Sequence, residues 1–258
     1  MKRFLLIIGL FLYCLLLSST NHFQEKFREA NQHYRNDDFE IALESYLKLE
    51  QDGLINADLF YNTGNCFFRI QNLGKAILYY KKALKVNPDH QLSQQNLEFA
   101  QTFTQDKQYY ESNDFMSVLK NKFLDKISIN TFAIINLFLF FCITLTIILL
   151  LTRYRYKEKA IPIFILLLLI IIIAVSSLCS YIKWNNYHDD SQAVLISNSA
   201  IGYSGPRENY TRVFTIHEGL IFTIEKSQKG WSLIKLPNGI GGWIKSDNLE
   251  RIKFLTKT

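Results

Sequence analysis

Two long stretches of the chain contain no charged residue. They are TFAIINLFLFFCITLTIILLL, residues 131–151, and IPIFILLLLIIIIAVSSLCSY, residues 161–181. A helix needs about 20 apolar residues to cross the hydrocarbon core of a bilayer, so each stretch is long enough for one crossing. Pro162 lies in the first turn of the second stretch, where its missing N–H costs nothing. The pattern predicts two transmembrane helices joined by a short loop, residues 152–160.

Residues 1–20 have the pattern of a secretory signal. Lys2 and Arg3 precede an apolar run over residues 4–17, and small polar residues follow it. The run is short for a full membrane span, which favours a signal peptide. The sequence Ser18-Ser19-Thr20 fits a cleavage site only weakly, so an uncleaved anchor is the alternative.

The segment between residues 23 and 90 repeats itself with the period of 34 residues that is typical of tetratricopeptide repeats. The matched pairs are Ala30 and Gly64, Asn31 and Asn65, Tyr34 and Phe68, Phe39 and Leu73, Ala42 and Ala76, and Tyr46 and Tyr80. The second copy carries the family's spacing of large and small residues at Phe60, Gly64, Phe67, Ala76, Tyr80, Ala83 and Pro88. The pattern predicts all-α repeats over residues 23–110.

Gly64 stands in the middle of a predicted helix, where glycine costs roughly 1 kcal/mol relative to alanine. In a tetratricopeptide repeat, a small residue here lets the second helix pack closely against the first. Burial of Phe60, Phe67 and Tyr80, which this closeness permits, is worth about 1.5–3 kcal/mol per side chain. This gain outweighs the cost of the glycine.

Two repeats alone bury little apolar surface, and stacked repeats usually need a third unit or a cap. The segment after His90 reads as an amphipathic helix. Its apolar residues are Leu92, Leu97, Phe99, Ala100 and Phe103. We expect this helix to cap the stack, and residues 111–130 to form a juxtamembrane connection.

The first helices of the repeats are expected to line a concave surface. The candidate partner-binding residues on this surface are Phe27, Asn31, Arg35, Tyr61, Asn65 and Arg69. Amides can bond the backbone of a partner, and arginines can bind carboxylates through two hydrogen bonds. An extended or helical peptide is therefore the expected ligand. In the alternative, Tyr34 and Phe68 only pack between repeats and the arginines are solvated.

After residue 181 the composition changes to short β-type runs separated by turn residues. The expected strands are Ala193–Ser197, Arg212–Ile216, Leu220–Glu225, Trp231–Leu236 and Gly242–Ile244, with turns at SGP, HEG, QKG and PNG. Several short strands at this spacing predict a small all-β barrel. The order of these motifs resembles a bacterial SH3-type domain, which we assign to residues 190–253.

Bacterial SH3-type domains often bind peptidoglycan or peptides, so the resemblance implies a ligand of one of these classes. Tyr203 replaces the arginine that is usual before the SGP turn, which leaves the ligand open. Tyr203, Trp231 and Trp243 are the candidate ligand-binding residues. The alternative is that the tryptophans mainly fill or cover the core of the barrel.

The formal net charge of +6 comes mostly from basic residues near the apolar stretches. The loop between the stretches carries Arg153, Arg155, Lys157 and Lys159 with one acid, Glu158. Cytoplasmic loops carry such an excess, so the segments before and after the two spans are expected on the exported side. Lys120, Lys122 and Lys126 favour the opposite orientation. Basic residues next to spans suit anionic lipid, and no nucleic-acid partner is expected.

No grouping of residues points to catalysis or to a bound metal. The five histidines are scattered, without a second histidine or a cysteine at ligand spacing. Cys66 is the one cysteine outside the signal and the spans, and we expect it to be a buried thiol rather than a nucleophile. A phosphate-binding glycine loop is absent from the sequence. We therefore expect no enzyme activity, no metal and no cofactor.

Taken in order, the signal, the tetratricopeptide pair, the NLEFA cap helix, the two spans and the SH3-type domain resemble the Bacteroides aerotolerance protein BatE family. The resemblance covers nearly the whole chain. It implies a bacterial inner-membrane protein whose N- and C-terminal domains lie on the periplasmic side. It also implies that other Bat proteins, which carry von Willebrand factor A-type domains, are its partners in tolerance of oxygen or oxidative stress.

Two functional hypotheses follow. The first is a non-enzymatic scaffold whose repeat groove holds a partner protein while the SH3-type domain holds a second ligand. The alternative is an envelope anchor that binds peptidoglycan through the SH3-type domain.

Overall fold

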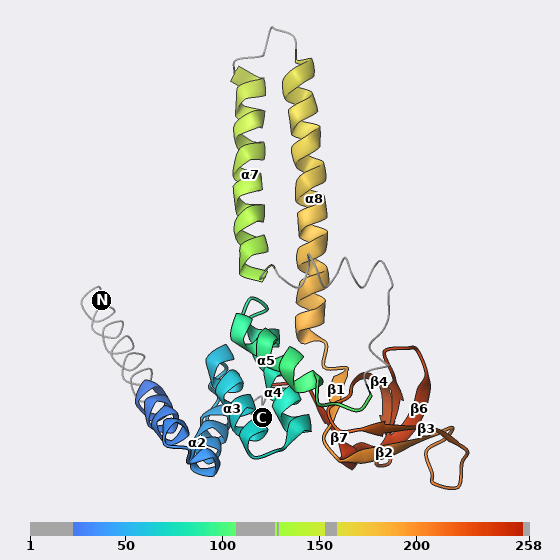
Figure 1. The fold of residues 1–258 in the computed structure, drawn as a ribbon. Coiled ribbons are helices and arrows are strands. Elements are labelled where there is room, and N and C mark those ends of the chain that lie inside the picture. Colours follow the sequence, from blue (N-terminus) through green and yellow to red (C-terminus); the bar gives the residue numbers. More distant parts are fainter. Residues whose placement is uncertain (1–22, 107–126, 128, 153–158, 255–258) are drawn as a thin grey trace, which may run out of the picture. The chain divides into compact units, whose positions relative to one another are not determined.

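The computed structural model describes residues 23–106, 127, 129–152 and 159–254. The expected signal or anchor lies outside the described residues, as do most of the juxtamembrane segment and the centre of the basic loop. The described chain forms two compact units (Figure 1). The helices before the spans and the sheet after them make up one unit, and two long apolar helices belong to the other. The expected fold class of helical repeats, two apolar helices and an all-β domain is confirmed.

The apolar unit is a pair of helices, α7 (Ile129–Thr152) and α8 (Ala160–His188). Each contains a segment long and apolar enough to cross a membrane, and only 6% of that segment is buried in the fold. A core helix of a soluble protein would be mostly buried. Asn136 Nδ2 of α7 donates a hydrogen bond to Ser180 Oγ of α8 at 3.2 Å. Three residues separate the end of α8 from the first strand of the sheet.

The repeat region consists of paired helices, as the period predicts. A helix over residues 23–35 and α2 (Phe39–Gln51) form the first pair, α3 (Ala57–Arg69) and α4 (Leu73–Val86) form the second, and α5 (Gln91–Gln101) follows. The turn inside each pair uses a left-handed residue at the equivalent position, Asp37 with φ 63° and Gln71 with φ 62°. Asn56 and Asn72 cap α3 and α4 by accepting hydrogen bonds from backbone N–H groups of the first turn.

Gly64 lies where α3 packs closely against α4. A Cβ atom at Gly64 would lie 2.7 and 2.8 Å from ring carbons of Tyr80 and 3.3 Å from the carbonyl oxygen of Ala76. The ring of Tyr80 is 2% exposed and Phe60 is 0% exposed. The expectation that this glycine exists for close helix packing is confirmed.

A buried ion pair that the sequence analysis missed joins the second helices of the two repeats. Lys82 Nζ of α4 donates to Glu50 Oε1 of α2 at 2.9 Å, and Tyr79 Oη donates to Glu50 Oε2 at 2.7 Å. Both charged side chains are 3% exposed. Burial and then the nearby Glu50 carboxylate raise the pKa of Tyr79, so its hydroxyl remains a donor.

The C-terminal domain is one antiparallel sheet of seven strands in the order β3-β2-β6-β5-β4-β1-β7. The strands are β1 (Gln192–Leu195), β2 (Ser199–Tyr203), β3 (Arg212–His217), β4 (Ile221–Gln228), β5 (Trp231–Lys235), β6 (Gly241–Lys245) and β7 (Leu249–Arg251). Five of them correspond to the expected strands, whereas β2 and β7 were not expected. The PNG turn between β5 and β6 is confirmed, with Gly239 at φ 88°. The strands enclose a core that includes Leu195, Ile216, Ile234 and Ile244, all 0% exposed.

The sheet packs against the repeats, which the sequence analysis did not anticipate. The turn between β3 and β4 reaches the start of α4, where Glu218 Oε1 accepts a hydrogen bond from Gly74 N at 2.7 Å. The next residue, Gly219, has φ 85°, and a Cβ there would lie 2.7 Å from the side chain of Ile77. The HEG sequence is therefore both a turn and a contact surface.

The first strand and the end of the domain pack on the same helix. Val194 of β1 and Ile252 after β7 are 0% and 2% exposed and belong to one apolar cluster with α3 and α4. The ring of Phe254 stacks on Phe60 at a centroid distance of 5.7 Å. Repeats and sheet thus share a continuous apolar core. We call this contact the seam.

Both points at which the chain leaves this unit for the apolar helices are held at the seam. Asp106, the last described residue before the connection to α7, is 3% exposed and accepts a hydrogen bond from the backbone N–H of His217. The other oxygen of its carboxylate lies 3.1 Å from His217 Nδ1. On the return side, Asp190 Oδ1 accepts a hydrogen bond from Lys85 Nζ at 2.9 Å.

Candidate functional site

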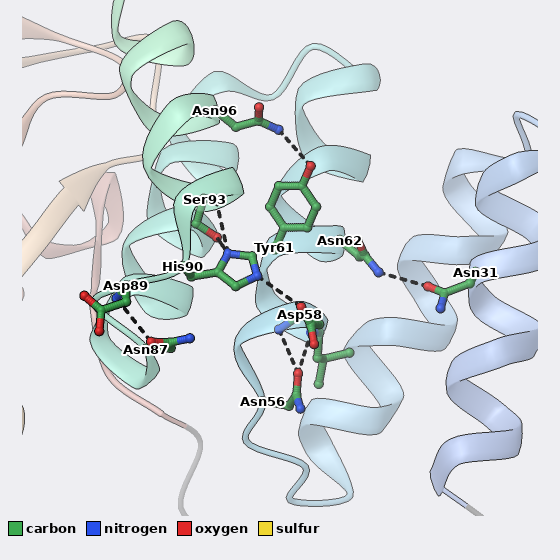
Figure 2. A network of polar contacts seen from close by, with 11 residues as sticks. Asn31, Asn56, Asp58, Tyr61, Asn62, Asn87, Asp89, His90, Ser93 and Asn96 are labelled. Atoms are coloured by element: carbon green, nitrogen blue, oxygen red, sulfur yellow. Dashed lines mark hydrogen bonds and ion pairs between the residues drawn. The ribbon is translucent and has the colours of Figure 1, made fainter. Parts of the chain in front are cut away.

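The candidate groove is built on a ladder of amide side chains. Asn31 Oδ1 accepts hydrogen bonds from Tyr46 Oη at 2.6 Å and from Asn62 Nδ2 at 2.9 Å. The first bond joins the two helices of a repeat, and the second joins neighbouring repeats. The Asn31–Asn62 bond is visible in Figure 2.

The same arrangement recurs at the equivalent positions of the next repeat. Asn65 Oδ1 accepts from Tyr80 Oη at 2.9 Å and from Asn96 Nδ2 at 2.8 Å. Because Asn96 belongs to α5, this helix stands where the first helix of a third repeat would. The recurrence of asparagine at positions 62 and 96, one period apart, is the sequence signal that would have revealed the ladder.

Tyr61 is partly buried at the junction between α3 and α5 (Figure 2). Its ring centroid is 5.3 Å from that of His90, and its hydroxyl oxygen accepts a hydrogen bond from Asn96 Nδ2 at 3.5 Å. His90 Nε2 in turn lies 3.0 Å from Asp58 Oδ1. These contacts fix the angle at which α5 closes the stack.

Phe27 and the two arginines occupy different environments. Phe27 is partly buried against the core, 5.9 Å from the ring centroid of Tyr46. Arg69 Nη2 donates to Asp37 Oδ1 at 3.2 Å, and its guanidinium carbon lies 4.1 Å from the ring centroid of Phe39. Arg35 is exposed. Of the six candidate residues, the structure therefore joins Asn31 and Asn65 to the amide ladder and pairs Arg69 within the chain.

Helix α5 and the turn after it bury only some of their apolar residues. Leu97 and Ala100, three positions apart, face the repeat core at 9% and 0% exposure. Phe99, on the adjacent face of α5, is 56% exposed, because a helix buries only one stripe against its neighbour. Phe103, in the turn just after α5, is 57% exposed. Leu92 is also exposed, at 52%.

Phe99 and Phe103 form an aromatic group with Phe68 of α3. The ring centroids lie 5.7 Å apart for Phe68 and Phe99, 5.8 Å for Phe68 and Phe103, and 5.1 Å for Phe99 and Phe103. We call these three residues the phenylalanine cluster. The repeat period of 34 residues relates Phe99 to Asn65 and Phe103 to Arg69, so the cluster continues the candidate groove.

The sheet domain brings its three candidate residues to one face. The rings of Tyr203 and Trp231 meet edge to face with centroids 5.7 Å apart. Tyr203 pairs with Trp243 across β2 and β6, which places their side chains on the same side of the sheet. Tyr203 is 8% exposed, while both tryptophans are partly buried.

Cys66 and the groups that could bind a metal were the other candidates for chemistry. Cys66 is 0% exposed, and burial raises the pKa of its thiol to about 12, so the thiol stays protonated at neutral pH. Among the residues that the structure describes, no group of three or more His, Cys, Asp or Glu side chains could hold a metal ion.

Comparison with known families agrees with the geometry of both modules. Residues 57–90 match the Tetratricopeptide repeat family, and residues 197–250 match the Bacterial SH3 domain family. The chain therefore combines a tetratricopeptide repeat with a bacterial SH3 domain. The helix pair before residue 57 lies outside the first match and is supplied by the structure. No curated protein matches the chain.

Replacing Asn65 tests whether the ladder stabilises the repeats. In Asn65→Ala, Tyr80 Oη loses its acceptor and Asn96 Nδ2 keeps only the 3.5 Å bond to Tyr61 Oη. A buried donor left unsatisfied costs about 1–3 kcal/mol. We expect urea unfolding of the full chain in detergent, followed by helical circular dichroism, to show a loss of this size. Gln95→Ala, at an exposed position of α5, is the control. Equal stability of Asn65→Ala and wild type would contradict a structural role for the ladder.

Proposed function

We propose that the protein is a membrane-anchored, non-enzymatic scaffold that binds partner proteins through its repeats. Tetratricopeptide repeats and bacterial SH3 domains are typically binding modules. The observation that carries the proposal is the seam, because it unites the two modules into one body attached to a pair of apolar helices. Such a body can hold two ligands at a fixed separation beside a membrane.

The seam also supports the proposed sidedness. Residues 23–106 precede the apolar helices and residues 190–254 follow them, yet the two segments share a buried core. Segments that fold together must lie on the same side of a membrane, which agrees with an even number of crossings between them. The excess of arginine and lysine in the connecting loop favours a cytoplasmic loop. Both modules then face the periplasm, and the membrane is the bacterial inner membrane.

Cysteine labelling tests this sidedness. Lys48→Cys on α2 and Glu225→Cys on β4 replace exposed residues, and both should react with an impermeant maleimide once the outer membrane is opened. Arg155→Cys in the loop should react only after the inner membrane is broken. The unmodified chain serves as the blank. Reaction of only one of the two domain reporters would contradict both the sidedness and the shared core.

The resemblance to the BatE family supplies the finer proposal. It names other Bat proteins with von Willebrand factor A-type domains as the partners, and tolerance of oxygen or oxidative stress as the setting. The groove on the first helices of the repeats is the proposed contact surface, with Arg35 and Arg69 as the exposed polar groups at its edge. Asn31 and Asn65 serve the groove by fixing its helices.

Crosslinking in intact cells followed by mass spectrometry tests the groove. We expect Arg35→Ala combined with Arg69→Ala to reduce capture of a von Willebrand factor A-type protein by about tenfold, the effect of roughly 1.4 kcal/mol. Lys48→Ala, an exposed cation on α2, should capture as much as wild type. Undiminished capture by the double variant, at an equal level of protein in the membrane, would remove the groove as the contact surface.

The second candidate function is an envelope anchor that binds peptidoglycan. It is favoured by the gathering of Tyr203, Trp231 and Trp243 on one face of the sheet. Aromatic faces of this kind present large apolar surfaces with polar edges, which suits stacking on a sugar or peptide ligand.

Sedimentation with purified cell wall tests the anchor. If the aromatic face binds the wall, the full chain in detergent should sediment with it, and Trp231→Ala should lose most of this retention. Tyr210→Ala replaces an aromatic residue of the same domain that is 46% exposed, and serves as the matched control. No retention of the wild-type chain would eliminate this function.

A further inference from the structure

We propose that the phenylalanine cluster binds a large apolar side chain of a partner peptide, and that basic rather than acidic residues flank this side chain. The inference rests on the proposed function, since it specifies the chemistry of the ligand at one end of the groove. It adds an apolar contact to the amides and arginines that the sequence analysis expected to recognise the ligand.

The polar groups of the groove are largely engaged within the chain. The side-chain oxygens of Asn31 and Asn65 each accept two internal hydrogen bonds. Arg69 is paired with Asp37 and lies over the ring of Phe39. A partner that relied on these groups would first have to displace internal contacts, whereas the two exposed rings of the cluster can be covered without any such loss.

A further repeat is not what would cover the cluster. Gln94, Glu98 and Gln101 occupy the positions on α5 that Phe60, Gly64 and Phe67 occupy on α3. Those α3 residues pack against the second helix of their repeat, whereas a polar row on α5 is the outer face of a capping helix. Phe99 and Phe103 instead lie at the groove positions of the third unit.

The exposure of the cluster indicates an interaction site. Phe99 and Phe103 are 56% and 57% exposed, yet each ring already touches Phe68, so the three rings form one apolar surface. Phenylalanine, like the other aromatic residues, buries a large apolar area in interfaces and contributes much of their energy.

Charge decides between possible occupants. From Gln91 to Asp106 the chain carries no lysine or arginine, and its two acids are Glu98, which is exposed, and Asp106, which is buried against His217. Arg69, next to Phe68 in the sequence, is paired with Asp37. Surfaces that bind anionic bilayers combine apolar residues with Lys and Arg, so this surface does not fit a lipid headgroup layer. Glu98 is exposed beside Phe99 and attracts a basic neighbour of the bound apolar side chain.

Peptide selection tests the inference. Random peptides displayed on phage are panned on the full chain in detergent, and enriched peptides are synthesised and titrated by fluorescence anisotropy. The variant is Phe99→Ser combined with Phe103→Ser, and the control is Leu92→Ser, which removes an equally exposed apolar residue from the same helix. Arg35→Ala with Arg69→Ala reports separately on the rest of the groove. Thermal unfolding verifies that each variant is folded.

We expect enriched peptides to carry Phe, Trp or Leu next to Lys or Arg. They should bind the double serine variant at least about tenfold more weakly, as for loss of an aromatic hot spot, and bind Leu92→Ser like wild type. Phe103→Ser alone should give an intermediate loss. Peptides that lack an apolar residue, have acidic neighbours or bind the double serine variant equally well would overturn the inference.

Other outcomes separate this inference from the proposed function. Binding that is lost in Arg35→Ala with Arg69→Ala but kept in the double serine variant refutes the role of the cluster and leaves the groove. Failure to enrich any peptide on the wild-type chain refutes both. A dimer of the wild-type chain that the double serine variant dissociates would assign the cluster to a second copy of the chain and also overturn the inference.

Discussion

The shared core between the repeats and the SH3-type sheet is the constraint on which the rest of the structure depends. Helix α4 is covered by α3 within its own repeat and by β1, the β3–β4 turn and the end of the sheet domain at the seam. An apolar helix at the end of a repeat stack must be covered, because stacked repeats expose a continuous core at their ends. Here a second domain shares that role with α5.

Joining the modules in this way changes what each can do. A flexible pair of domains would bind its two ligands independently, with a separation that varies. A pair with a common core presents the groove and the aromatic face of the sheet in a fixed relation. Because Asp106 and Asp190 are also held there, the connections toward the apolar helices start from fixed points.

The sequence predicted those features that depend on local patterns. Gly64 and the PNG turn have fixed local meanings, and the length of the apolar stretches identifies the two long helices without reference to the rest of the chain. The seam could not be predicted in this way, since Glu218 and Gly74 are far apart in sequence and neither has an unusual local pattern. The pairing of Glu50 with Lys82 was hidden for the same reason.

The candidate site shows a second limit of sequence reasoning. Repeat positions located Asn31 and Asn65 on the first helices, but position alone does not reveal that their oxygens are engaged within the chain. Likewise, an apolar residue on a capping helix can face the core, as Leu97 does, or the groove, as Phe99 does. A rotation of the helix by one residue position separates these outcomes, and only the packing geometry decides it.

The three residues between α8 and β1 limit how far the sheet domain can lie from the end of α8. Fully extended, they span only about 10 Å, so a short connection tethers the C-terminal domain to α8. Because the repeats share an apolar core with that domain, the same short connection restrains them as well. In the proposed membrane scaffold, this connection limits how far either module could extend from α8, so any longer reach would have to come from the partner.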